Sequence, residues 1–249
     1  MENIVVHWEL GSHDPESLGQ FYAGLFGWRI EPQETMDYHV AYTRSERGIN
    51  GGIMRVEEGI PPYLVFYVVV EDLQATLGRA QQLGGQTVFP PTPIPGVGTF
   101  AHITDPQGFL IGAIEPPPDW DEQAAEQQRK EEGGLPVMHW EIGSGEPAEL
   151  HAFYTALFGW TIDTDTPLNY PMVRTGGAGG IDGGIYEAED PDHRFLTIYV
   201  QVNDLSATLT KAGSLGASYV GEIASVPGIG RFSIVGDPEG RFIGVMEEE

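Results

Sequence analysis

Two short runs of the sequence place an imidazole and a carboxylate two residues apart. The first is His7-Trp8-Glu9 and the second is His139-Trp140-Glu141. Each run lies in a stretch of alternating apolar and polar residues, the period of a half-buried strand, so the histidine and the glutamate share a face, about 7 Å apart. Such a pair could contact a ligand, transfer protons, bind a metal with a third residue, or be an ordinary polar pair facing water.

The two runs belong to an internal duplication. Residues 7–28 (HWELGSHDPESLGQFYAGLFGW) match residues 139–160 (HWEIGSGEPAELHAFYTALFGW), a shift of 132 positions (139 − 7 = 132). The same shift aligns most later landmarks of the first half with the second, without a gap. A match of this length predicts a tandem repeat of one domain. We expect domain 1 at residues 1–115, a proline-rich and acidic linker at 116–135 that is at most a solvated helix, and domain 2 at 136–249.

Hydrophobic periodicity predicts an alternation of strands and helices in each repeat. A strand covers residues 4–11, after which Asp14 and Pro15 begin an amphipathic helix that ends at Gly27. The later elements expected in the first repeat are strands at 38–43, 52–56 and 63–70, a helix from 72 to 84, and two or three strands whose last pair is joined by a type I turn at 105–108. Each repeat is therefore predicted as strand-helix-strand-strand-strand, written twice.

The composition excludes several classes of protein. The formal net charge is -25, with 37 acidic against 12 basic side chains, so the chain should repel nucleic acids and anionic membranes. The acidity is typical of a solvated surface, although adaptation to salt and attraction of cationic ligands are alternatives. There is no cysteine, no apolar run of transmembrane length and no signal-peptide pattern, so we expect a cytoplasmic protein.

These residues resemble the vicinal oxygen chelate superfamily, which includes glyoxalase, bleomycin-resistance proteins and extradiol dioxygenases. The resemblance rests on the strand at His7, the FYAGLFGW helix, the V-x-D-L helix start at 70–73 and the DPQG turn, and it covers about residues 4–115 and 136–247. The tandem arrangement is most similar to two-domain glyoxalase-like proteins. It implies an α+β fold in which paired βαβββ modules form a curved, partly open β-barrel with a cleft in each repeat.

Enzymes of the superfamily bind a divalent metal in this cleft, and the resemblance shows where the ligands would stand. His7 and His139 occupy the first ligand position. The other positions hold no suitable side chain, since they fall on Val65 and Thr197, on Gly112 and Gly244, and within the runs 51–54 and 183–186. A single histidine is too few for a stable site. The resemblance therefore implies that metal-dependent lyase or dioxygenase activity is disfavoured, unless Glu9 and Glu141 complete a different site.

Aromatic residues repeat at the same shift, and aromatics with a polar tip commonly line small-molecule pockets, although in a strand-rich protein they are more often core. The repeats also differ, because His39, Tyr42 and His102 correspond to Pro171, Arg174 and Ile234; either these are isolated surface residues or the two sites have different chemistry. The candidate ligand-binding residues are His7, Glu9, Tyr38, Tyr67, Phe100, His102, His139, Glu141, Tyr170, Tyr199 and Phe232.

Three functions fit these observations. The favoured one is a metal-independent binder of a polar or cationic small molecule, as in bleomycin resistance, with no cofactor and no assigned catalytic residue. The alternatives are a metal-dependent lyase or dioxygenase using the two His-x-Glu pairs, and a protein-interaction module with vestigial clefts. We expect a monomer whose repeats form a pseudo-dimer, or a weak homodimer.

Overall fold

The computed structural model describes residues 2–33, 36–120, 133–166, 170–177, 179–190, 194–226 and 228–249. Strands predominate, and four helices are present within these ranges. The linker helix considered for residues 121–132 lies outside the described residues. None of the described helices combines the length and the apolar character that a membrane-crossing segment needs.

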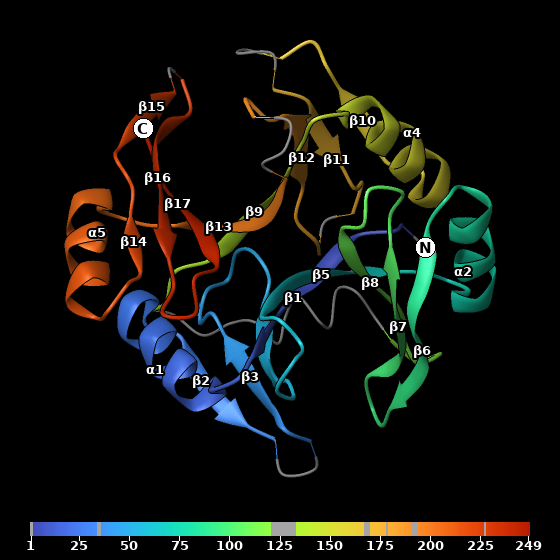
Figure 1. Ribbon diagram of the computed structural model, residues 1–249, viewed down its shortest axis with the longest axis horizontal. Helices are drawn as coiled ribbons and strands as arrows, with labels where there is room; N and C mark the ends of the chain where they lie inside the picture. The colour runs from blue at the N-terminus through green and yellow to red at the C-terminus, as the bar shows by residue number, and fades with distance from the viewer. Residues whose placement is uncertain are drawn as a thin grey trace. The chain divides into compact units, whose positions relative to one another are not determined.

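The first repeat contains two modules of the predicted βαβββ order (Figure 1). Module 1 consists of β1 (Val5–Ser12), α1 (Pro15–Phe26), β2 (Arg29–Pro32), β3 (Tyr38–Tyr42) and β4 (Gly51–Arg55). Module 2 consists of β5 (Tyr63–Val69), α2 (Leu73–Gln82), β6 (Gln86–Ile94), β7 (Gly98–Thr104) and β8 (Leu110–Glu115). The predicted order is confirmed, and β2 is a strand whose position the sequence pattern did not indicate.

The second repeat follows the first closely. Module 3 consists of β9 (Val137–Ser144), α4 (Pro147–Phe158), β10 (Thr161–Asp163), β11 (Met172–Arg174) and β12 (Gly183–Glu187). Module 4 consists of β13 (Phe195–Gln201), α5 (Leu205–Ser214), β14 (Tyr219–Val220), β15 (Ala224–Val226), β16 (Gly230–Gly236) and β17 (Phe242–Glu248). Module 4 differs from module 2 because the long β6 corresponds to two short strands, β14 and β15.

Hydrogen bonding joins the strands into two sheets, one for each repeat. The order is β2-β3-β4-β1-β5-β8-β7-β6 in the first sheet and β10-β11-β12-β9-β13-β17-β16-β14 in the second, where β15 also pairs with β16. The first strand of each module pairs in parallel with the last, as β1 does with β4 and β5 with β8. Neither order returns to its starting strand, so both sheets are open, as the predicted α+β architecture requires.

Local sequence explains where α1 begins and ends. The Asp14 side chain accepts a hydrogen bond from the Ser17 backbone N–H at 3.0 Å, and Pro15 occupies the first turn, where its missing N–H costs nothing. Gly27 ends the helix with φ 74°, a left-handed conformation that glycine adopts without strain. In α4 the equivalent N-cap is Glu146, whose longer side chain makes no capping bond.

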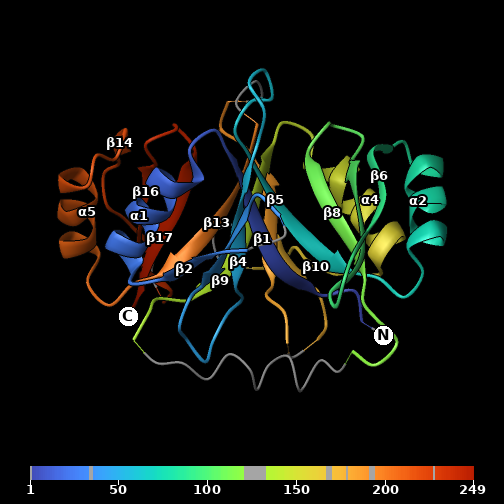
Figure 2. The same cartoon turned by 90° about the horizontal axis from the view of Figure 1, so that it is seen from below.

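The chain divides into two compact units, and each contains parts of both repeats. Unit 1 comprises residues 1–7, 65–127 and 140–196, which include most of modules 2 and 3. Unit 2 comprises residues 8–64, 128–139 and 197–249, which include most of modules 1 and 4. Accordingly, α2 contacts α4 in unit 1 and α1 contacts α5 in unit 2, and each pair lies side by side in both views (Figures 1 and 2). The boundaries given from sequence, 1–115 and 136–249, stay a prediction.

Unit 2 is held together by a buried polar contact between the repeats. The Tyr22 hydroxyl on α1 donates to Asp237 Oδ2 at 2.9 Å, in the turn between β16 and β17. The Arg241 guanidinium pairs with the same carboxylate at 2.8 Å and donates to the carbonyl of Gly11. Asp237 is fully buried, and a buried carboxylate needs such partners. The aromatic core beside this contact includes Trp8 and Trp28, with ring centroids 5.0 Å apart.

Unit 1 repeats this contact with one difference. The Tyr154 hydroxyl on α4 donates to Asp105 Oδ2 at 2.8 Å, but Phe109 stands at the position of Arg241. Burial raises the pKa of Asp105 above its usual value, although hydrogen bonds from Tyr154 and the turn backbone oppose the shift. Each DPxG turn of one repeat therefore receives the tyrosine of the other repeat's FYxxLFGW helix.

Candidate functional site

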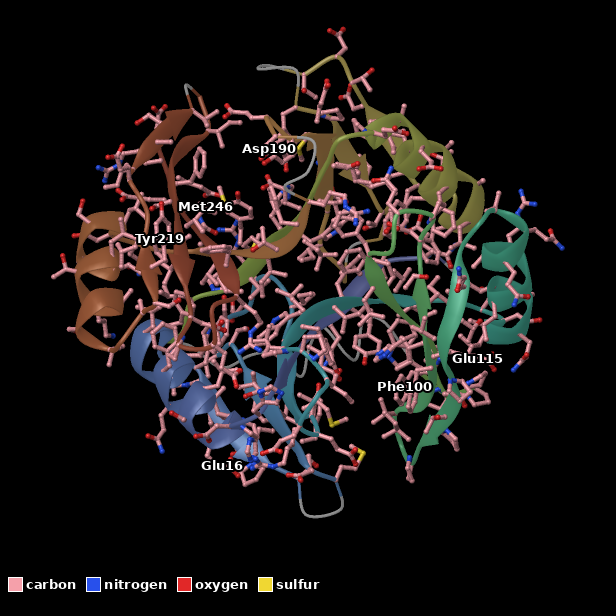
Figure 3. The ribbon with its side chains drawn as sticks, in the orientation of Figure 1. Glu16, Phe100, Glu115, Asp190, Tyr219 and Met246 are labelled. Carbon is pink, nitrogen blue, oxygen red and sulfur yellow. The ribbon has the colours of Figure 1, made fainter. Side chains whose placement is uncertain are left out.

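Histidine cluster 1, in unit 1, consists of His7, Tyr67, Phe89, Phe100 and His102. The ring centroids of His7 and Tyr67 are 5.8 Å apart in an edge-on arrangement, and Tyr67 lies 6.0 Å from Phe100. The Tyr67 hydroxyl and His102 Nε2 are 2.8 Å apart, a hydrogen-bond distance. The ring contact shows that His7 of β1 and Tyr67 of β5 lie on the same face of the sheet. Phe100, labelled in Figure 3, belongs to β7.

The two imidazoles of this cluster are neutral at pH 7. Burial lowers the pKa of His7 to about 4, and burial likewise lowers the pKa of His102 to about 4. A neutral imidazole carries one donor and one acceptor nitrogen. The cluster can therefore donate and accept hydrogen bonds, and it presents rings without a cationic side chain.

Histidine cluster 2, in unit 2, is the smaller equivalent and consists of His139, Tyr199 and Phe232. The centroids of His139 and Tyr199 are 6.0 Å apart, and those of Tyr199 and Phe232 are 6.4 Å apart, both in edge-on arrangements. The position of His102 is taken by Ile234. The two repeats therefore share a histidine, a tyrosine and a phenylalanine but not the second imidazole.

Carboxylate cluster 1, in unit 2, consists of Glu9, Tyr38 and Tyr63. Glu9 is only 4% exposed, and its Oε1 accepts a hydrogen bond from the Tyr63 hydroxyl at 2.7 Å. Burial, followed by the charge of Glu9, raises the pKa of both tyrosines. Both phenols thus remain protonated donors beside a buried carboxylate.

Carboxylate cluster 2, in unit 1, consists of Glu141, Tyr170, Tyr186 and Phe195. Glu141 is 7% exposed and accepts a hydrogen bond from the Tyr170 hydroxyl at 2.8 Å. The Tyr170 and Tyr186 rings lie 5.6 Å apart, and Tyr186 meets Phe195 edge-on at 6.0 Å. Burial and the nearby Glu141 raise the pKa of Tyr186. A tyrosine hydroxyl thus donates to the buried carboxylate in both repeats, from Tyr63 in the first and from Tyr170 in the second.

Tyrosine side chains occupy two of the three positions where the superfamily's other metal ligands would stand, and the third holds Val65 or Thr197. A Cβ added at Gly112 would overlap the Tyr67 ring, and one added at Gly244 would overlap the Tyr199 ring. The same holds for Gly52 beneath the Tyr38 hydroxyl and for Gly184 beneath that of Tyr170. Glycine at these positions thus makes room for a tyrosine, and a carboxylate there would collide with it.

The donor set consequently does not fit the metal of the superfamily. Within the ranges that the structure describes, no three histidine, aspartate or glutamate side chains gather closely enough to hold an ion. Phenols that stay protonated are poor ligands for a divalent cation, whereas three or more imidazole, carboxylate or thiolate groups are the usual requirement.

Sequence reasoning found most of these residues but not all of them. The structure brings together His7, Tyr67, Phe100 and His102 in one cluster, His139, Tyr199 and Phe232 in a second, and Glu141 with Tyr170 in a third. Glu9 and Tyr38 form the fourth with Tyr63, which was missed. The other missed residues are Phe89, Tyr186 and Phe195. Strand parity with Tyr67 could have indicated Tyr63, and the 132-residue shift then leads to Phe195.

The fold and these clusters define the class of protein. Two open sheets, each built from a pair of βαβββ modules with a histidine on the first strand, form the tandem fold of the vicinal oxygen chelate superfamily. Solved structures agree: a Mn(II)-bound glyoxalase from Novosphingobium aromaticivorans superposes with a TM-score of 0.67 over 100% of this chain and 83% of that one, at 14% identity. Homoprotocatechuate 2,3-dioxygenase from Arthrobacter globiformis superposes with a TM-score of 0.69 over 99% of this chain and 80% of that one, also at 14% identity.

Sequence comparison places the chain within this class. The model of the glyoxalase-like domain matches residues 4–112 and 141–246, so the chain belongs to the glyoxalase-like domain family. It is 27% identical to CFP32 of Mycobacterium tuberculosis, a protein named as a candidate glyoxylase, over 96% of this chain and 92% of that protein. It is also 26% identical to DnrV of Streptomyces peucetius, which is named as an anthracycline biosynthesis protein, over 96% of this chain and 91% of that protein.

Proposed function

We propose that the chain is a metal-independent small-molecule binding protein whose binding groups are the histidine and carboxylate clusters of each compact unit. The observation that carries this proposal is that glycines stand at positions of the superfamily's metal ligands and that tyrosine rings pack directly against them. Gly112 and Gly244 do this beneath Tyr67 and Tyr199. The rings supply apolar contact area with a polar tip, which is the usual lining of a small-molecule site.

The carboxylate clusters indicate what such a ligand carries. Glu9 and Glu141 are buried, yet each accepts a hydrogen bond from a phenol. A buried carboxylate with aromatic neighbours suits a cationic or hydrogen-bonding group, because charge and ring faces both attract a cation. The name of DnrV, which refers to the biosynthesis of a small molecule, supports a ligand of this size class.

A thermal-shift screen of the full chain tests this function. The chain is treated with a chelator, dialysed, and heated with Mn²⁺, Zn²⁺, Ni²⁺ or Fe²⁺, with small organic cations, and with neutral aromatic compounds. Binding to the native state raises the unfolding midpoint with ligand excess. We expect organic compounds to stabilise the chelator-treated chain and metals to leave it unchanged; stabilisation by a metal alone would overturn the proposal.

Paired variants then assign the carboxylates. Glu9→Gln combined with Glu141→Gln should abolish stabilisation by an organic cation, while Glu71→Gln, at an exposed carboxylate, should preserve it. An unchanged shift in the double variant would remove both glutamates from the set of binding groups. We also propose that the chain is cytoplasmic and acts as a monomer or weak homodimer, and the net charge of -25 favours the monomer because like charges repel.

A further inference from the structure

The two histidine clusters differ at two positions of the repeat. Both contain a tyrosine and a phenylalanine at matching positions of the repeat. Cluster 1 adds Phe89 and His102, whereas the corresponding residues of the second repeat are Gly221 and Ile234. The first repeat therefore has an additional ring and an additional imidazole on the same scaffold.

Phe89 is positioned by an irregularity of β6. The pairing of β6 with β7 shifts register on both sides of Phe89, between Thr87 and Phe89 and between Phe89 and Thr92, and the residue opposite Phe89 is His102. Bulges of this kind re-aim a side chain and are frequent beside binding sites. In the second repeat Gly221 lies between the short strands β14 and β15, so neither the strand nor the ring is reproduced there.

The additional ring is stacked on one side and open to solvent. Phe89 and Phe100 have centroids 5.5 Å apart and an interplanar angle of 15°, a stacked geometry. Phe100 is 9% exposed, but Phe89 is 41% exposed. Phe89 is thus held against a buried ring while its own ring stays accessible. Another flat ring can pack on such a surface, because offset stacking adds a favourable free energy to that of the buried area.

A hydrogen-bonding edge lies next to this ring. The Phe89 and His102 centroids are 5.7 Å apart, and His102 Nε2 lies 2.8 Å from the Tyr67 hydroxyl. Because the imidazole is neutral at pH 7, the pair presents both donor and acceptor character without a charge. A phenolic hydroxyl or a ring carbonyl is the ligand group that matches such an edge.

Resting on the proposed function, we infer that histidine cluster 1 binds a neutral planar aromatic ligand bearing a hydroxyl or carbonyl group. The ligand's ring stacks on Phe89, and its oxygen hydrogen-bonds at the His102–Tyr67 pair. Histidine cluster 2 does not bind this ligand class. The chain therefore has one site of this kind, in the first repeat.

Isothermal titration calorimetry of the full chain with 2-naphthol tests the inference. We expect one site per chain, and at least tenfold weaker binding of decahydro-2-naphthol, which keeps the hydroxyl but loses the flat ring. Phe89→Leu and His102→Ile should each weaken 2-naphthol roughly tenfold, the upper size of an aromatic pair contact. Phe242→Leu is the matched control, because that ring is 44% exposed and meets Tyr219 edge-on, and it should leave affinity unchanged.

Each outcome decides the inference. Two equivalent sites per chain, equal binding of the saturated alcohol, or an unchanged affinity in Phe89→Leu would overturn it. If 2-naphthol fails to bind while another organic compound stabilises the chelator-treated chain, the ligand class is wrong and the proposed function stands. If only a metal stabilises the chain, both are wrong. Because Phe89 is exposed, the Phe89→Leu variant should fold. Its affinity for 2-naphthol therefore tests the inference even if the His102→Ile variant does not fold.

Discussion

Replacing a glycine beneath a tyrosine should cost stability, whereas replacing a glycine in open space should not. A Cβ at Gly112 would overlap the Tyr67 ring, while a Cβ at Gly78, within α2, would meet nothing within 4 Å. Gly112→Ala forces the ring to move, and overpacking of this kind costs about 1–3 kcal/mol. A displaced ring also loses the 2.8 Å contact with His102, worth about 0.5–1.5 kcal/mol.

The total expected for Gly112→Ala is therefore a loss of about 1.5–4.5 kcal/mol in the free energy of unfolding. Gly78→Ala should instead gain about 0.5–1 kcal/mol, because alanine is the better helix former. Denaturant unfolding of the full chain, followed by circular dichroism, measures both changes. A loss at Gly112 together with a gain at Gly78 is the expected result.

A double-mutant cycle shows whether Tyr67 is the cause. In a Tyr67→Ala background, Gly112→Ala should cost almost nothing, so the coupling energy should account for most of the single-variant loss. A loss of the same size in both backgrounds would refute the reasoning, as would a benign Gly112→Ala variant. The equivalent pair Gly244 and Tyr199 in unit 2 provides an independent repeat of the measurement.

Three further predictions concern packing, pH and capping. Tyr154→Phe should cost about 1.5–3 kcal/mol in thermal unfolding, and Tyr22→Phe less, because Arg241 still pairs with the aspartate in that unit; equal losses would contradict this. Folding lowers the pKa of His102 from 6.5 to about 4. The contribution of the neutral imidazole to stability is therefore complete above pH 6.5 and is lost as the pH falls toward 4. The His102→Gln variant should accordingly lose less stability than the parent protein when the pH is lowered from 7 to 5. Glu146→Asp should stabilise α4 by about 0.5–1 kcal/mol by restoring a capping side chain, and no gain in the melting temperature would argue against it.

The sequence predicted local features well because their causes are local. The start and end of α1 follow from Asp14, Pro15 and Gly27, and the structure has them as expected. The strand β2 was missed because it spans only Arg29–Pro32 and two of its four residues are exposed, so it carries no clear hydrophobic alternation. Elements of this length acquire their structure from the neighbouring strand, here β3.

Long-range features could be predicted only in part. The 132-residue shift indicated two equivalent sheets, but not that the Tyr22 hydroxyl would reach Asp237 and that each compact unit would draw on both repeats. The absent carboxylate at Gly112 could be read directly from the sequence. The sequence could not show that a tyrosine ring fills this space, because a contact between a tyrosine and a glycine on two different strands has no periodic signature.

The metal content of the full chain tests the central claim most directly. The chain is purified without chelator, passed through gel filtration, and measured by inductively coupled plasma mass spectrometry. Because tyrosine rings packed against Gly112 and Gly244 fill the positions of metal ligands, we expect far less than one equivalent of manganese, iron, nickel or zinc per repeat. One tightly held ion per repeat, removed by chelator with a fall in the unfolding midpoint, would contradict the account.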